Sequence, residues 1–157
     1  MTSLPYDPGV IPTAPSPNEG ESMSFRVEGL PPYKDRHFSI RNKRHKIYGR
    51  FKDLRKIAIN AMNGRAPFRG AVGLDIVIHA PELESKKSLN DYMGGVMDTL
   101  DGSSGVEFTF LPIAYEDDCQ VASGRNSFIE DQKCFYIIEV TFLQDRLNGE
   151  QNVDPNA

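Results

Sequence analysis

The strongest constraint on this chain is an abrupt change of hydrophobic period near residue 64. Over residues 44–64 one stripe of apolar residues recurs at helical spacing; its members are Ile47, Phe51, Leu54, Ala58 and Ala61. Over residues 70–80 the apolar residues alternate instead, as in a strand with one buried face. Asn63-Gly64, a typical helix end, separates the two patterns. The pattern predicts an amphipathic helix followed directly by a strand.

Further alternating segments predict strands at residues 23–29, 37–42, 118–125 and 134–143. A second helix is expected over residues 88–102, with Ser88 or Asn90 as its N-cap. Its apolar stripe consists of Leu89, Met93, Val96, Met97 and Leu100. Gly94-Gly95 inside this helix costs about 1 kcal/mol per glycine relative to alanine. Five strands and two helices in the order ββαβαββ predict an α+β two-layer sandwich with a mixed β-sheet.

A length of 157 residues favours a single domain. Residues 1–22 hold five prolines and no Lys or Arg, so we expect a disordered N-terminal tail. Residues 146–157 have a similar composition, which leaves 23–145 as the folded domain. No apolar run is long enough to span a membrane and no signal peptide is visible, so a cytoplasmic protein is expected. Cys119 and Cys134 are then expected to be free thiols.

Charge is distributed unevenly along the chain. Residues 34–56 carry ten Lys and Arg against two Asp, a net charge of +8. Residues 75–118 carry ten acidic residues against two Lys, a net charge of −8. A basic lobe beside an acidic one fits a phosphate-binding surface beside a cation site. The alternative is that both are solvated faces.

Four stretches occur in a suggestive order. They are FRVEGLPPYKDRH at 25–37, the basic amphipathic helix at 44–64 with the following strand that ends in HAP at 79–81, SLNDYMGGVMDTLDG at 88–102, and EDDCQV at 116–121. Together they resemble the RusA family of Holliday-junction resolvases, over about residues 24–142. The resemblance implies a small α+β domain that pairs into a homodimer. It also implies Mg²⁺-dependent nicking of four-way DNA junctions in recombination and repair, often in a phage or prophage.

The third and fourth stretches are similar to the family's D-x-D-N-x-x-K-x-x-x-D-x-L and D-D-x-Q-[VI] motifs. The two ligand aspartates of the first motif fall on Ser88 and Asn90, its asparagine on Asp91, and its lysine on Gly94. Asp118 keeps its ligand identity, whereas Asp98 matches only as a helix residue. Because Mg²⁺ relies on anionic oxygen ligands, the resemblance implies a weak or lost nuclease activity.

An exchanged order of Asn90 and Asp91 would restore a metal site. Asp91 and Asp118 are then the candidate catalytic residues, and the metal ligands are Asn90, Asp91, Asp117 and Asp118. Lys86 or Lys87 would replace the missing lysine. Alternatively, Asp91 and Asp98 are ordinary acids of a helix surface, Asn90 is a cap and the Asp pair is a solvated turn.

Basic residues on either side of the motifs are the candidate DNA contacts, because Lys and Arg neutralise phosphates. They are Lys34, Arg36, Arg41, Lys43, Arg44, Lys46, Lys86 and Lys87. Three functions stay open at this point. The chain is a RusA-like junction endonuclease, active or weakened, or a catalytically dead homologue that binds DNA junctions, or an interaction module that keeps only the fold.

Overall fold

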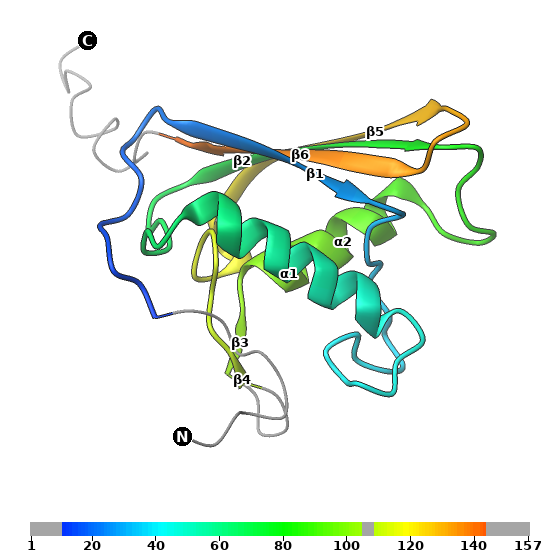
Figure 1. Ribbon diagram of the computed structural model, residues 1–157, viewed down its shortest axis with the longest axis horizontal. Helices are drawn as coiled ribbons and strands as arrows, with labels where there is room; N and C mark the ends of the chain where they lie inside the picture. The colour runs from blue at the N-terminus through cyan, green and yellow to red at the C-terminus, as the bar shows by residue number, and fades with distance from the viewer. Residues whose placement is uncertain (1–10, 105–108, 144–157) are drawn as a thin grey trace, which may run out of the picture.

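The computed structural model describes residues 11–104 and 109–143, in which a four-stranded sheet forms one layer and two helices form the other (Figure 1). The strands of the sheet are β1 (Ser22–Glu28), β2 (Val72–Ala80), β5 (Val121–Glu130) and β6 (Phe135–Phe142). The helices are α1 (Tyr48–Met62) and α2 (Leu89–Leu100). The short strands β3 (Ser103–Ser104) and β4 (Thr109–Phe110) pair with each other, and a 3-10 turn η1 (Asp118–Gln120) precedes β5.

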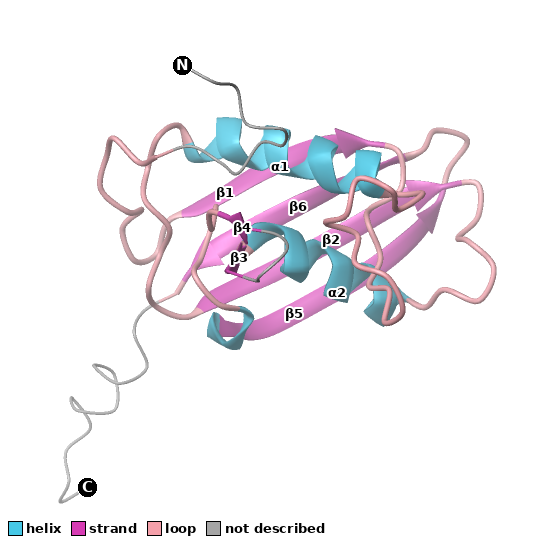
Figure 2. Cartoon of the chain, turned by 90° about the horizontal axis from the view of Figure 1, so that it is seen from below, coloured by secondary structure: helices cyan, strands magenta, loops and turns pink. Residues whose placement is uncertain are grey.

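The sheet is mixed and has the strand order β1-β6-β2-β5 (Figure 2). β2 runs parallel to β5 and antiparallel to β6, and β1 runs antiparallel to β6. β5 and β6 are consecutive in the chain, yet β2 lies between them. The predicted α+β two-layer class with a mixed sheet is therefore confirmed.

Alternation along the central strands builds the core between the two layers. The β2 residues Val72, Leu74, Ile76 and Ile78 and the β6 residues Tyr136, Ile138, Val140 and Phe142 are all at most 2% exposed. From the helical layer, Phe51 and Leu54 of α1 meet them with no exposed surface. The apolar stripe of α1 and the buried faces of β2 and β6 thus belong to one core between the two layers.

The C-terminus of α1 and the N-terminus of α2 lie where the sequence indicates. Asn63 adopts a left-handed conformation with φ of 52°, and its backbone N–H donates to the last carbonyls of α1. At the start of α2, Ser88 and Asp91 form a capping box, in which each side chain accepts a hydrogen bond from the other residue's backbone N–H. Ser88 is therefore the N-cap of α2.

Residues 37–42 form turns, not the predicted strand. Here, side chains bond the backbone locally: Asp35 Oδ1 accepts from His37 N, Ser39 Oγ from Arg41 N, and Asn42 Oδ1 from Arg44 N. Such bonds compete with the ladder of a sheet, so the alternation of Phe38 and Ile40 is not enough to extend this segment.

The buried face of α2 is wider than its predicted stripe. Tyr92, Gly95 and Thr99 are buried, whereas Leu89, Met93 and Met97 are only partly buried. α2 packs against both β5 and α1, so two of its sides are covered.

Arg55 of α1 does not belong to the exposed basic face predicted for this helix. It is 1% exposed and donates to the carbonyl oxygens of Thr99 and Leu111.

The N-terminal segment is attached to the domain from residue 13 onward, which differs from the tail predicted over residues 1–22. Thr13 and Ala14 donate backbone hydrogen bonds to Gly64 O, and Ser16 Oγ donates to Pro67 O. Pro17 is buried. The loop after α1 offers these carbonyl oxygens, which composition does not reveal. Residues 1–10 and 144–157, the remainder of the predicted tails, lie outside the described residues.

Candidate metal centre

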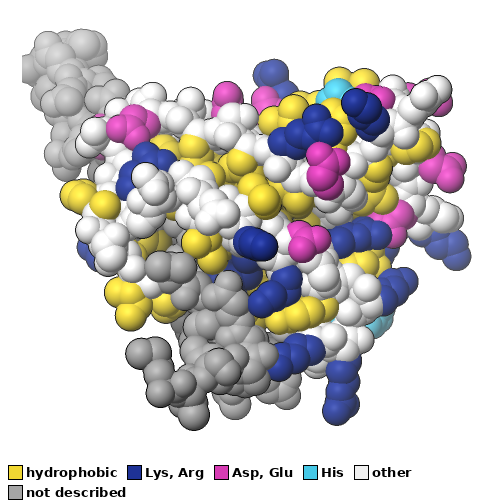
Figure 3. All heavy atoms as spheres, viewed as in Figure 1, with side chains coloured by type: hydrophobic (Ala, Val, Ile, Leu, Met, Phe, Trp, Pro, Cys, Tyr) yellow, Lys and Arg dark blue, Asp and Glu magenta, His cyan; other side chains and the backbone are white. Residues whose placement is uncertain are grey.

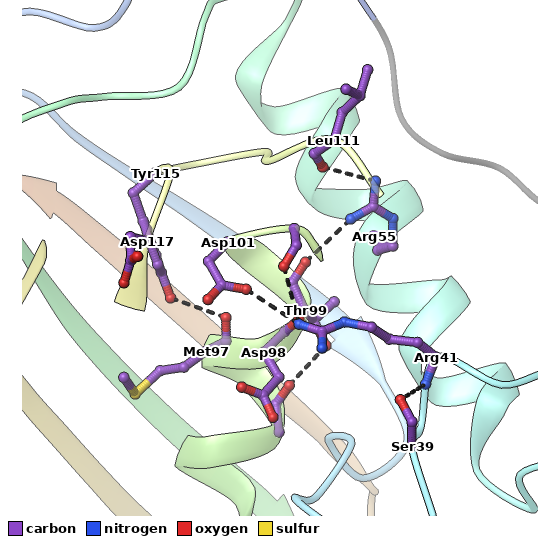
Figure 4. Close-up of polar contacts among 12 residues, drawn as sticks. Ser39, Arg41, Arg55, Met97, Asp98, Thr99, Asp101, Leu111, Tyr115 and Asp117 are labelled. Atoms are coloured by element: carbon purple, nitrogen blue, oxygen red, sulfur yellow. Dashed lines mark hydrogen bonds and ion pairs between the residues drawn. The ribbon is translucent and has the colours of Figure 1, made fainter. Parts of the chain in front are cut away.

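Three carboxylates meet where α2 ends and η1 begins. Asp98 lies in the last turn of α2, Asp101 is its C-cap residue, and Asp118 is the first residue of η1. One oxygen of each carboxylate lies within 4.8 Å of the other two. Figure 4 shows the Asp98 and Asp101 side chains on the same side of the helix end. We refer to Asp98, Asp101 and Asp118 as the carboxylate trio.

Helix geometry explains why the first two members of the trio converge. Asp98 and Asp101 are three residues apart, so they share one helix face. Arg41 reaches this helix end from the loop before α1, and its Nη2 donates to Asp98 O at 2.5 Å, Gly102 O at 3.1 Å and Asp101 Oδ1 at 3.4 Å. A guanidinium at the carbonyl end of a helix opposes the negative end of its dipole. Arg41 therefore fixes the end of α2 and orients Asp101.

Gln120 positions the third carboxylate. Its Oε1 accepts from the backbone N–H groups of Glu116 and Asp117, and its Nε2 donates to the carbonyl oxygens of Phe68 and Gly70. These four bonds use the full capacity of the amide. They tie the 116–120 turn to the loop before β2 and so place Asp118 beside α2.

The trio carries more negative charge than its surroundings compensate. Burial raises the pKa of Asp101 to about 7, and the charges of Asp98, Asp118 and Asp117 act in the same direction. Burial also raises the pKa of Asp98, with the charge of Asp118 adding to this, although Arg41 and Lys34 oppose it. Partly buried carboxylates that repel one another are stabilised by a cation.

The donor set fits a hard divalent cation. Mg²⁺ binds carboxylate oxygens, keeps several of its waters and needs only a few protein ligands. Arg41 contacts Asp101, so one guanidinium faces the three carboxylates of the trio there. The trio, rather than the predicted set of ligands, brings together the carboxylate oxygens with which the described residues could hold a metal ion.

Two open hollows border the trio. One has a volume of about 470 Å³ and is lined by Asp101, Gly102, Phe110, Pro112, Glu116, Asp117 and Asp118. The other, of about 260 Å³, lies between Asp98 and the loop of residues 35–41. Phe38 lines this second hollow and is 41% exposed. The trio is therefore accessible from two sides.

Asn90 and Asp91, two of the predicted ligands, lie at the other end of α2. The Asp91 carboxylate accepts from Ser88 N at 2.8 Å and from Ser88 Oγ at 3.1 Å, and these bonds depress its pKa. Ten residues of helix separate Asp91 from Asp101, a rise of about 15 Å. The expectation that Asp91 and Asp118 share a site therefore fails, because Asp118 lies beside the C-cap residue Asp101 and α2 is one continuous helix from Asp91 to that end.

Of the other predicted site residues, Asp117 lies near the trio, whereas Lys86 and Lys87 lie at the Asp91 end of α2. Asp117 caps η1 by accepting from Cys119 N, which lowers its pKa, and it lines the larger hollow. Lys86 and Lys87 precede α2 at its Asp91 end, and the Lys87 ammonium lies 3.9 Å above the Tyr33 ring. Neither lysine replaces the family's missing lysine at the trio.

Of the predicted DNA contacts, all but two are exposed: Lys34, Arg36, Lys43, Arg44, Lys46 and Lys86. Arg41 and Lys87 are partly buried and are engaged as described above. Figure 3 shows Lys and Arg side chains gathered over α1 and the loop that precedes it. Arg36 and Arg41 of this loop line the smaller hollow together with Asp98.

Sequence reasoning missed Asp101 as a ligand, although its spacing of three from Asp98 was a usable signal once the helix was predicted. It also gave no role to Tyr115, which is buried and donates from its hydroxyl to Met97 O at 3.4 Å, as drawn in Figure 4. No sequence signal links Tyr115 to α2.

No protein-family model matches this sequence, and no curated protein matches it. Neither helix within the described ranges is long and apolar enough to cross a membrane. Cys119 and Cys134 are free thiols, as expected. The resemblance to the RusA family therefore stays a prediction from the four stretches of sequence.

Proposed function

We propose that this chain is a divalent-cation-dependent endonuclease that acts on DNA, with Mg²⁺ held by Asp98, Asp101 and Asp118. The observation that carries the proposal is the convergence of these three carboxylates within 4.8 Å, beside a hollow that Asp98 lines together with Arg36 and Arg41. The motif comparison indicates a weak or lost activity because it assigns the ligands to residues 88 and 90. The trio restores three anionic ligands from other positions, so the loss of charge inferred from the motif does not apply.

The roles of the residues follow from their positions. A bound Mg²⁺ polarises a phosphodiester and lowers the pKa of a water molecule. Arg41 and Gln120 hold the ends of α2 and η1, so the three ligands are preorganised. The exposed residues Lys43, Arg44 and Lys46 attract the DNA backbone, a role in which each neutralised phosphate contributes to affinity.

The resemblance narrows the substrate to branched DNA, in particular a four-way junction. A junction is two-fold symmetric, so cutting opposed strands calls for two symmetry-related sites. We therefore propose a homodimer as the working form, which light scattering at micromolar protein concentration would detect.

A nicking assay on a synthetic four-way junction, with Mg²⁺ or Mn²⁺, tests the proposal. We expect nicking by the unmodified chain, with a linear duplex of the same sequence as the substrate control. Asp118→Asn and Asp101→Asn should each lower the single-turnover rate by about 10²–10³, the cost of one preorganised electrostatic contact.

Asp91→Asn is the matched control, because it changes an acid of the same helix outside the trio. It should leave the nicking rate within about threefold of the unmodified chain. Metal-independent junction binding without nicking would favour the catalytically dead homologue instead. An Asp91→Asn variant that loses nicking while Asp101→Asn keeps it would favour the ligand set expected from an exchanged order of Asn90 and Asp91.

A further inference from the structure

The segment Pro32–Lys34 crosses α2 at its two adjacent glycines. A Cβ atom built on Gly95 would overlap the Pro32 carbonyl oxygen and would lie 2.6 Å from Tyr33 Cα. The backbone N–H of Lys34 donates to Asp91 O at 2.9 Å. Backbone contacts thus fix the crossing point, and Gly95 is needed for the close approach.

The aliphatic stem of Lys34 lies on Gly94. A Cβ atom built on Gly94 would lie 3.1 Å from Lys34 Cβ and 3.2 Å from Lys34 Cδ, so the stem occupies the space above this glycine. Asp98 follows Gly94 by one helical turn on the same face. The stem therefore packs on the face of α2 that also carries Asp98.

Two cations pack at this face of α2, and they differ in what they bind. The Arg41 guanidinium donates to two backbone carbonyls and to Asp101. Lys34 is exposed, and within the described residues its ammonium makes no hydrogen bond or ion pair of its own. An ammonium whose stem packs one helical turn from Asp98, with its donors unused, can meet an anion from solution.

We infer that Lys34 is the cation of this site that binds the phosphate of the substrate, by donating to a non-bridging oxygen of the phosphodiester at the trio. Gly94 has a role in this arrangement, because a side chain at position 94 would compete with the Lys34 stem for space. The inference rests on the proposed nuclease function for its catalytic consequence and on the packing at Gly94 for its geometry.

Replacing Lys34 by methionine tests the inference, since Lys34→Met keeps a flexible stem over Gly94 and removes only the charge. In single-turnover nicking at saturating protein, we expect the rate to fall by about 10²–10³. Lys34→Arg, which keeps the charge, should retain most of the rate. A Lys34→Met rate equal to that of the unmodified chain would overturn the inference.

Lys133→Met is the matched control, because Lys133 is an exposed lysine in the loop between β5 and β6 and makes no contact with Gly94. It should leave both junction binding and the rate at saturation unchanged. Equal losses of rate in both variants would mean that the loss does not depend on the place of Lys34 over Gly94, and the inference would fail.

A second measurement separates this inference from the proposed function. Thymidine 5′-monophosphate, titrated with Ca²⁺ present, presents a phosphate to the site without requiring cleavage. We expect Lys34→Met to weaken its binding at least tenfold and Lys133→Met to leave it unchanged. If the unmodified chain binds this nucleotide through Lys34 but nicks no junction, only the nuclease proposal fails. Binding that is absent, or that is indifferent to Lys34, overturns the inference itself.

Discussion

At the scale of residues, the pKa of the partly buried carboxyl of Asp101 depends on burial and on the neighbouring carboxylates. Its pKa is raised to about 7 by burial and then by its acidic neighbours. A raised carboxyl pKa means that the folded state binds the proton more tightly than the unfolded state does. The stability that this proton provides is complete below about pH 4 and is lost as the pH rises through 7.

We therefore predict that the metal-free protein loses free energy of unfolding between about pH 4 and pH 7, with a slope of up to about 1.4 kcal/mol per pH unit from this residue. Asp101→Asn should flatten that slope, because the amide does not ionise. Urea unfolding at a series of pH values measures it. Asp91→Asn is the control with the opposite sign: the depressed pKa of Asp91 gives stability that is lost only as the pH falls below 4. An unchanged slope in Asp101→Asn would contradict the prediction.

For single residues, the sequence indicates which side chains are candidate ligands better than it indicates which other residues they contact. Asp118 and Asp98 could be picked out from their motifs, and the spacing of Asp98 and Asp101 along a helix was usable, but the bonds of Gln120 that hold the turn with Asp118 depend on where the loop before β2 lies. Local spacing cannot supply that information, because Gln120 and Phe68 are 52 residues apart.

At the scale of elements, the structure gives the glycine pair of α2 a packing role that the sequence does not reveal. From the sequence, Gly94-Gly95 is only a cost to helix stability. In the structure, Gly95 lets the Pro32–Lys34 segment lie against the helix. The two glycines lower the intrinsic stability of α2, and they also allow the crossing segment that carries Lys34 to pack against it.

We predict that Gly95→Ala destabilises the protein by about 1–3 kcal/mol, because the added methyl group would displace the Pro32 backbone. Gly49→Ala in α1 is the matched control: no atom lies within 4 Å of its built Cβ, so it should stabilise by up to about 1 kcal/mol. Chemical denaturation of the two variants measures both effects. A Gly95→Ala variant as stable as Gly49→Ala would show that the segment does not cross α2 here.

The sequence predicted helices and strands close to their observed ranges where the apolar periodicity is strong. The prediction was wrong where side chains form local hydrogen bonds with the backbone. α1, α2 and β2 lie within a few residues of their predicted ranges. The strand expected at 37–42 failed because Asp35, Ser39 and Asn42 bond the backbone locally. The burial of Arg55 could not be foreseen either, since its partners belong to α2 and to the loop at residue 111.

For the molecule as a whole, the basic surface and the trio are predicted to act on one ligand. Lys43→Gln, Arg44→Gln and Lys46→Gln combined should flatten the dependence of log K on log[salt] for junction binding, by about 0.9 for each phosphate contact removed. Fluorescence anisotropy over a salt series measures the slope. Arg41 is kept in this variant because it holds the end of α2.

Lys133→Gln, in the loop between β5 and β6, is the control for that measurement. Lys133 is exposed and lies outside the basic loop, so its replacement should leave the slope unchanged. A triple variant with an unaltered slope would place the DNA surface elsewhere on the molecule.

The central claim, that Asp98, Asp101 and Asp118 bind a divalent cation, is tested most directly by calorimetric titration with Mn²⁺ at pH 8, above the pKa of Asp101. We predict one site per chain in the unmodified protein, weakened at least tenfold in Asp101→Asn and in Asp118→Asn but unchanged in Asp91→Asn. An unmodified chain that binds no Mn²⁺, or one in which Asp91→Asn weakens binding as much as Asp101→Asn does, would contradict it.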